Sequence, residues 1–400
     1  MSIEEPLTAT KTFAYIGQFE RFKEPIKDAF TICDYDERSG AVRPIEAKFP
    51  GISVSSTYLD TARRVLYATD EGVTYDQAQH GYAGRVFAFR IDPVSGDLEE
   101  INHSPSYGSL PSSSTLDPTG RFLLVTHHTD RVPITRVEGD RESGFRVVQE
   151  YDAATLVLFA VGEDGAIGAP LDVVTFMGTG GAHRVQTHPQ LHAVVRSPSG
   201  GFYVICDKGE DRIYTVAIDE AEGRIRLLNG ETGFATVPGA SPRGFAFHPT
   251  EPYLYVNFQT RSVIGVYRYD EQGGLEEVQV ISSLPDGQPD SFTFKQADIR
   301  FHPSGRFLYS SVRGLNGISV FGVDGETGRL THLETIPLAG DSPRGCAISP
   351  DGRFMLVGTR YSNELWTYRI EEDGHLSPVG EHVEVASPGN ITFFTAPAGR

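Results

Sequence analysis

Cysteine, methionine and tryptophan are scarce in this chain: its 400 residues include three Cys, three Met and one Trp. The three cysteines, Cys33, Cys206 and Cys346, lie far apart, so they give neither a disulfide framework nor zinc-ligand spacing. Such cysteine usage is typical of a reducing compartment, and we expect a cytoplasmic protein. No apolar run approaches the ~18 residues of a membrane helix, and the first ten residues are polar. We therefore expect no membrane partner.

Positive charge is also in short supply, because 35 Lys and Arg stand against 53 Asp and Glu, a net charge of −18. A surface of this sign repels the phosphate backbone, so we expect no nucleic-acid partner. The common catalytic and nucleotide-binding motifs (P-loop, HExxH, GxSxG and CxxC) are absent from the sequence. We accordingly expect no cofactor and assign no metal ligands, and whether a metal is bound is left open.

Turn-forming and aromatic residues are abundant instead: 43 Gly, 25 Pro, 24 Phe and 17 Tyr. They accompany a repeated unit in which an apolar segment, a Pro-x-Gly-Arg-Phe turn and two further apolar strands follow one another. The clearest copies read TLDPTGRFLLVTHH, VVRSPSGGFYVICDKGEDRIYTVAID, FAFHPTEPYLYVNFQTRSVIGVYRYD, IRFHPSGRFLYSSVRGLNGISVFGVD and AISPDGRFMLVGTRYSNELWTYRI. Alternating apolar and polar residues between Gly and Pro turns indicate antiparallel strands.

A single four-stranded sheet cannot bury both of its faces, whereas copies stacked around an axis can. The sequence therefore predicts an all-β protein, a closed seven-bladed β-propeller that forms one domain over residues 1–400, with residues 1–11 as a flexible tail. Six units fit between about residues 53 and 379. The seventh blade must combine both ends of the chain, with Ala14–Gln18 and Ile391–Phe394 side by side.

Two long stretches, residues 73–84 and 129–153, interrupt the repeat. Loops of this length are usually functional or disordered. Their composition is polar and charged, which argues against a propeller that only docks a protein partner through exposed apolar loops.

Propeller geometry predicts which residues meet at one mouth of the central channel, because the innermost strand of each blade starts where the second strand ends. The starts of the first strands are Ser55, Ser56, Ser112, Ser113, Ser114, His192, Arg243, Asp298 and Arg344. The ends of the second strands are Asp70, Glu71, His127, His128, Asp207, Gln259, Arg313 and Arg360. Arginines that converge in so acidic a protein suit a carboxylate or phosphate ligand.

A structural role is the alternative for each of these residues. Arg344 and Asp298, for example, could pair as a strut between blades. His127 and His128 are neighbours on a strand, so we expect only one of them to face the channel. His192 opens an innermost strand and is the better placed general acid or base.

Several segments carry a resemblance: QADIRFHPSGRFLYSSVRGLNGISVF, SPRGFAFHPTEPYLYVNFQTRSVIGVY, SPRGCAISPDGRFMLVG and LHAVVRSPSGGFYVICDKGEDRI. They resemble the seven-bladed propeller lactonases, which include bacterial 6-phosphogluconolactonase and fungal carboxy-cis,cis-muconate cyclase. The resemblance covers nearly the whole chain. It implies an active site of one His, two Arg and one Glu at the channel mouth, and by motif it assigns His192, Arg243 and Arg313 to the first three.

The chain departs from the family pattern where protons would be transferred. The family's Asn-Glu pair reads Phe258-Gln259 here, so an amide stands in place of the expected carboxylate. Two further family histidines are replaced in Pro111-Ser112-Ser113 and Pro189-Gln190-Leu191-His192. These departures favour a lactone other than 6-phosphogluconolactone, or a related cyclisation or elimination.

The sequence therefore predicts a lactone hydrolase acting on a small acidic or sugar-derived molecule, with Arg243 and Arg313 as an anion clamp and His192 as acid or base. The substrate-binding residues would be Glu71, His127, His128, Gln259, Asp298 and Arg344. A cycloisomerase or lyase on a carboxylate, or a non-catalytic binding propeller, remains as the alternative. The oligomeric state is left open.

Overall fold

The computed structural model describes residues 10–20, 27–71, 84–129 and 133–397. All of its regular elements are strands, and seven antiparallel sheets form the blades. From the innermost strand outward, blade 1 is β4 (Val54–Asp60), β5 (Val65–Asp70), β6 (Arg85–Ile91) and β7 (Leu98–Pro105). Blade 2 is β8 (Pro111–Leu116), β9 (Phe122–His127), β12 (Ala154–Val161) and β13 (Ile167–Phe176). Blade 3 is β14 (Leu191–Arg196), β15 (Tyr203–Asp207), β16 (Arg212–Asp219) and β17 (Arg224–Leu227), with β18 (Phe234–Ala235) beside β16.

The remaining blades repeat this order. Blades 4 to 6 are β19 (Pro242–Phe247), β20 (Tyr253–Phe258), β21 (Val263–Tyr269) and β22 (Leu275–Ser282); β23 (Lys295–Phe301), β24 (Phe307–Arg313), β25 (Gly317–Val323) and β26 (Leu330–Pro337); β27 (Pro343–Ile348), β28 (Phe354–Thr359), β29 (Glu364–Ile370) and β30 (Leu376–Pro378), with β31 (Val383–Glu384) beside β29. Blade 7 is β32 (Pro388–Thr395), β1 (Thr12–Gln18), β2 (Phe30–Tyr35) and β3 (Val42–Lys48).

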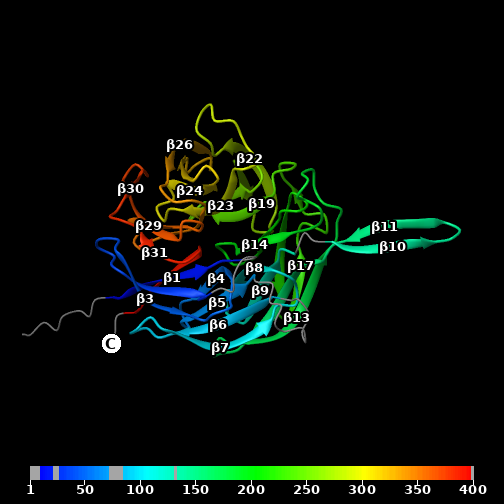
Figure 1. Ribbon diagram of the computed structural model, residues 1–400, viewed down its shortest axis with the longest axis horizontal. Coiled ribbons are helices and arrows are strands. Elements are labelled where there is room, and N and C mark those ends of the chain that lie inside the picture. The colour runs from blue at the N-terminus through cyan, green and yellow to red at the C-terminus, as the bar shows by residue number, and fades with distance from the viewer. Residues whose placement is uncertain (1–9, 21–26, 72–83, 130–132, 398–400) are drawn as a thin grey trace, which may run out of the picture.

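Blade 7 closes the ring with both ends of the chain. The C-terminal strand β32 is its innermost strand and pairs with β1, with Ala14 opposite Phe393 and Ile16 opposite Ile391. Figure 1 shows the blue and red ends of the chain in this one blade. The prediction of seven blades with shared termini is confirmed, and the closure leaves no open edge around the channel.

A repeated tyrosine explains part of the sequence period. In four blades a buried Tyr of the second strand donates its hydroxyl hydrogen to the carbonyl of a turn glycine in the next blade. The pairs are Tyr15–Gly96, Tyr67–Gly165, Tyr255–Gly328 and Tyr309–Gly374, with O···O distances of 2.8 to 3.0 Å. At Gly96 the backbone has φ of 77° and a Cβ would collide with the ring of Phe13, so only glycine fits.

The second insertion forms a hairpin, β10 (Ile134–Asp140) and β11 (Gly144–Glu150), which projects from blade 2 beyond the ring (Figure 1). One face is charged and includes the Arg146–Glu138 ion pair at 2.8 Å. The other face exposes Val137, Phe145 and Val147, each to 66–72%. The insertion is polar in composition, but strand alternation places three of its apolar residues on one exposed face, while Ile134 and Val148 lie on the other.

Two other predictions concern residues that the structure leaves out. The first insertion, apart from Gly84, and residues 1–9 of the predicted tail lie outside the described residues.

In the described part of the chain, no helix has the length and apolar character needed to cross a membrane. Cys33, Cys206 and Cys346 are all buried free thiols.

Candidate active site

Every innermost strand has a β-bulge near its start, where the register with the second strand shifts. A bulge inserts one unpaired residue and re-aims its side chain. One residue at each of the seven shifts lines the same cavity of about 130 Å³ in the channel: Ser55, Ser112, His192, Arg243, Ala297, Arg344 and Gly389. The site is therefore built from seven equivalent positions that carry different side chains.

The backbone before these bulges is strained. Two residues ahead of the bulge, Leu110, Ser241, Ser342 and Ser387 have φ between 42° and 62°, a left-handed conformation that costs energy outside glycine. Such strain is typical of functional sites, and here it sets the direction in which the strand enters the channel.

A second set of equivalent residues follows the end of each second strand. In six blades the backbone N–H of this residue donates to the carbonyl just before the innermost strand, and in blade 5 Arg313 pairs with Lys295. The seven residues are Phe19, Glu71, His128, Lys208, Gln259, Arg313 and Arg360. For blade 3 the sequence pointed to Asp207, whereas the equivalent residue is Lys208. Counting one residue past the strand end, as for Glu71 and His128, would have found it.

Five cations from blades 3 to 6 gather at this mouth. We name them the cationic arc: Lys208, Arg243, Arg313, Arg344 and Arg360. Burial, followed by repulsion from neighbouring arginines, holds the pKa of Arg313 well below its usual range. Burial also lowers the pKa of Arg243, partly offset by Asp298 and Glu71. An anion placed among these groups would relieve their repulsion.

Each arginine also contacts the protein. Arg243 is 8% exposed and donates from Nη1 to the carbonyl of Ala297, while its buried Nε–H has no hydrogen-bond partner among the described atoms. Arg313 donates to the carbonyls of Lys295 at 3.3 Å and Gln296 at 3.1 Å. These bonds fix the guanidinium groups and leave some of their five N–H donors for a ligand.

Among the described residues, Asp298 does not form the ion pair with Arg344 that was considered as a strut between blades. Asp298 pairs with Arg300 at 2.9 Å and accepts the N–H of Cys346 at 2.9 Å. The guanidinium of Arg344 instead lies 3.6 Å from the ring centre of Phe19. Residues 298 and 300 lie on the same face of β23, so a local pair forms without crossing the channel.

His192 lines the cavity where the cationic arc meets the serines of blades 1 and 2. Burial lowers its pKa well below the usual value, and Arg243, Lys208, His128 and Arg344 lower it further. Its imidazole is therefore neutral near pH 7 and can accept a proton. The ring of His128 stands edge-on to it, with centroids 5.6 Å apart.

Adjacent histidines take opposite directions, as predicted. His128 faces the channel mouth, where its Nε2 lies 2.5 Å from Nζ of Lys208. His127 points into blade 2, with Nδ1 3.1 Å from the carbonyl of Thr155, and burial lowers its pKa to about 4. The structure thus separates His127 from the channel cavity.

Glu71 and Gln259 both lie at the mouth. Glu71 is 5% exposed and interacts electrostatically with Arg243. Gln259 is half-buried beside blade 4, and its N–H donates to the carbonyl of Ser241 at 2.8 Å.

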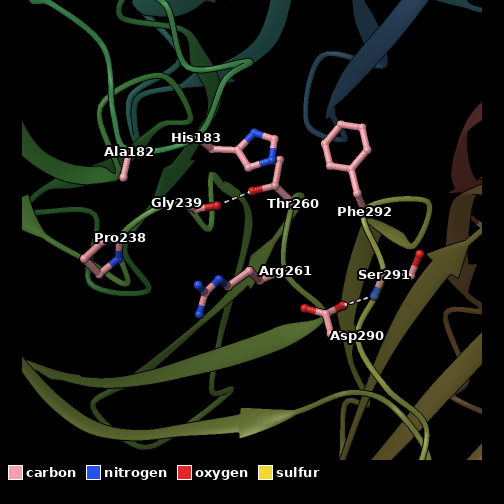
Figure 2. Close-up of a pocket in the computed structure, with 9 residues that line it drawn as sticks. All are labelled: Ala182, His183, Pro238, Gly239, Thr260, Arg261, Asp290, Ser291 and Phe292. Carbon is pink, nitrogen blue, oxygen red and sulfur yellow. Dashed lines mark hydrogen bonds between the residues drawn. The ribbon is translucent and has the colours of Figure 1, made fainter.

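A second pocket of about 250 Å³ lies beside the strand connections of blades 3 to 5 (Figure 2). Its walls include Arg261 and the stacked rings of His183 and Phe292, whose centroids are 5.0 Å apart. The hydroxyl of Thr260 donates a hydrogen bond to the carbonyl of Gly239, with an O···O distance of 2.7 Å. This pocket was not predicted from the sequence, and none of the bulge residues line it. Across the described ranges, no group of three or more His, Cys, Asp or Glu side chains could hold a metal.

Residues 13–393 match the family described as lactonase, 7-bladed beta-propeller. The chain belongs to this family. It is 28% identical over 388 residues to a 6-phosphogluconolactonase of Bacillus subtilis, covering 96% of this chain and 99% of that protein. It is 30% identical over 317 residues to a 6-phosphogluconolactonase of Pectobacterium carotovorum, covering 78% and 83% of the two chains.

Solved structures of similar shape show the same propeller. The periplasmic gluconolactonase PpgL of Pseudomonas aeruginosa superposes with a TM-score of 0.80 at 23% identity, covering 97% of this chain and all of that one. A putative 6-phosphogluconolactonase of Bacteroides fragilis also gives 0.80 at 23% identity, covering 98% and 100%. At this level of identity the likeness concerns the fold alone.

Proposed function

We propose that this protein hydrolyses the lactone of a small sugar acid at the channel mouth of its propeller. The names of its lactonase relatives support the reaction class. The observation that carries the proposal is one cavity that joins a neutral histidine, His192, to buried arginines in a chain of net charge −18. A cytoplasmic location belongs to the same proposal.

Lactone hydrolysis requires a base for water and positive charge for the oxyanion. Neutral His192 accepts a proton from water, which attacks the lactone carbonyl. Arg243 and Arg313 stabilise negative charge, either the charge that develops on the carbonyl oxygen or the charge of an anionic group on the substrate. The bond from the carbonyl carbon to the ring oxygen then breaks, and that oxygen takes up a proton.

The substrate need not be that of the curated relatives. Gln259 stands where the family resemblance leads us to expect a glutamate. An amide does not act as a base, and because it is uncharged it does not repel an anionic substrate. A cycloisomerase would need only an anion clamp and one proton-transfer group, so the same amide also supports cyclisation of a carboxylate as the second candidate.

A substrate panel tests the proposal directly. Purified protein is assayed with 6-phosphogluconolactone, gluconolactone, other aldonolactones and a carboxymuconate, each after subtraction of the uncatalysed rate. We expect enzymatic opening of at least one aldonolactone, reduced at least a hundredfold by His192→Gln. Cyclisation of the muconate without any lactone opening would establish the second candidate, and no turnover of any compound would contradict both.

A further inference from the structure

Lys208 is a buried lysine held at the channel mouth by a rigid turn. It follows β15 and is 3% exposed. Asp207, just before it, accepts the N–H groups of Gln190 at 2.8 Å and Gly209 at 2.9 Å, and Gln186 donates to the Lys208 carbonyl at 2.9 Å. The backbone of Lys208 is thereby fixed, and only the side chain can choose its partner.

One partner of this side chain is His128. The Nδ1 atom of His128 lies 3.1 Å from the carbonyl of Thr129, an acceptor, so Nδ1 carries the hydrogen and Nε2 accepts. Nζ of Lys208 lies 2.5 Å from this Nε2 and donates to it. The third group of the arrangement is His192, and the centroids of the imidazole rings of His128 and His192 are 5.6 Å apart. Three proton-carrying groups from blades 2 and 3 thus lie in series, and the last of them, His192, lines the cavity.

The sequence at this point complements Gln259. The turn after β15 reads Asp207-Lys208-Gly209-Glu210-Asp211-Arg212. A proton-carrying side chain thus stands on blade 3, next to the blade on which Gln259 carries an amide. Lys208 on blade 3 and Gln259 on blade 4 are equivalent residues, each following the end of the second strand of its blade.

We propose that Lys208 is the general acid that protonates the leaving ring oxygen, and that His128 positions it. This inference rests on the proposed lactone hydrolysis. Water loses a proton to His192 as its oxygen bonds to the carbonyl carbon. The bond between that carbon and the ring oxygen then breaks, and the ring oxygen takes a proton from the Lys208 ammonium group. Protonated His192 returns its proton to neutral Lys208, directly or through His128, so both residues end as they began.

An ammonium group suits this step because a sugar alkoxide is a far stronger base than an amine. Lys208 interacts with His128, His192 and Cys206, and Arg243, Asp207 and Glu210 are charged or titratable groups that interact with these or with their neighbours. Burial raises the pKa of Asp207 to about 7, so this neighbour changes charge near neutral pH. A pH profile must therefore be compared between variants rather than assigned from one curve.

The experiment compares leaving groups in wild type, Lys208→Met, His128→Gln and His192→Gln. The substrates are the best aldonolactone of the panel and the thiolactone of the same acid, whose thiolate leaves with little need of a proton. We expect Lys208→Met to lower kcat about a hundredfold for the lactone and less than fivefold for the thiolactone. His192→Gln should lower both about equally, because water must be activated in either case.

A second readout is the alkaline side of the pH profile of kcat/KM. Wild type should lose activity there as the ammonium group loses its proton, and Lys208→Met should lack this loss. Lys48→Met removes a lysine that pairs with Asp97 on the outside of the ring and is the matched control, expected to leave both substrates unaffected. Thermal midpoints identify any unfolded variant, and His128→Gln, expected to show a weaker form of the Lys208→Met pattern, replaces it if Lys208→Met is unfolded.

Equal losses for lactone and thiolactone in folded Lys208→Met, or an unchanged alkaline limb, would overturn the assignment and leave lactone hydrolysis standing. Wild-type protein that opens no lactone would overturn the proposed function, and this inference with it.

Discussion

At the bulge positions, blades 1 and 2 contribute serines to the channel cavity, whereas blades 4 and 6 contribute Arg243 and Arg344. The serine arc (Ser55, Ser56, Ser112 and Ser113) is engaged largely with the protein itself. Ser55 donates to the carbonyl of Pro111 at 2.9 Å, and Ser112 to the carbonyl of Leu191 at 3.0 Å, so each ties its blade to the next. The cationic arc keeps donors such as Nε–H of Arg243 without a partner among the described atoms.

Equivalent positions in the repeat thus serve different purposes. The hydroxyl groups satisfy backbone carbonyls between blades, which stabilises the ring. Burial, and then repulsion from Arg243 and Arg344, lowers the pKa of Arg313, so the charged guanidinium groups cost stability in the absence of an anion. Substitutions along the two arcs should therefore separate activity from stability.

The largest effect is expected at the junction of the arcs. His192→Gln removes the group that accepts a proton and keeps a side chain of similar size. General acid–base catalysis contributes about 10²–10⁴-fold, so kcat should fall by that range. Kinetics with the best lactone and a thermal melt measure it. A fall of less than tenfold would show that another residue activates water.

Arg313→Lys should lower kcat/KM about 10²-fold or more. An ammonium group carries the charge but cannot keep its bonds to the carbonyls of Lys295 and Gln296 while also contacting an anion through a fork. The thermal midpoint should stay near that of wild type. If instead the midpoint drops sharply and kcat/KM survives, the arginine is a strut like the serines.

The decline of kcat/KM at low pH measures how strongly the positive charges of the cationic arc lower the pKa of His192. The neutral imidazole is the active form, and its pKa lies below 6.5, so kcat/KM should stay level as the pH falls through 6.5 and decline only below it. Arg243→Gln removes a positive charge that lowers this pKa, so the decline should begin at higher pH. A limb that stays in place would mean that His192 does not sense the arc.

Gln259→Glu adds a negative charge at blade 4 of the mouth. Two unit charges about 4 Å apart at an effective dielectric constant of about 20 interact by roughly 4 kcal/mol. A quarter of that, about 1 kcal/mol, corresponds to about fivefold weaker binding of an anionic substrate. We expect this loss in titrations and no gain with 6-phosphogluconolactone. Efficient hydrolysis of that lactone by the variant would show that the amide is a minor departure.

The smallest kinetic effect is expected in the serine arc. Ser112→Ala removes one hydrogen bond between blades 2 and 3, which is worth about 0.5–1.5 kcal/mol of stability. Denaturant unfolding should detect that loss, while kcat/KM should change less than threefold. A large kinetic loss here would erase the distinction between the arcs.

Much of the site could be predicted from the sequence because the repeat has a fixed geometry. Once the turns mark where each innermost strand begins, His192, Arg243 and Arg344 must lie at one mouth of the channel. The family resemblance singles out His192, Arg243 and Arg313. What failed was a matter of single residues: Asp207 in place of Lys208, and Arg344 in place of Arg300 as the partner considered for Asp298.

The sequence by itself determined the number of blades, the closure by both termini and the mouth at which the charges gather, because apolar periodicity and turn residues are local signals repeated along the chain. Only the tertiary structure decided which face of each strand the bulges turn into the channel. It alone brought Lys208 to His128 across two blades, and set the apolar face of the hairpin at the surface. A shift of one residue reverses a side chain in a strand, and that register depends on contacts between segments far apart in the sequence.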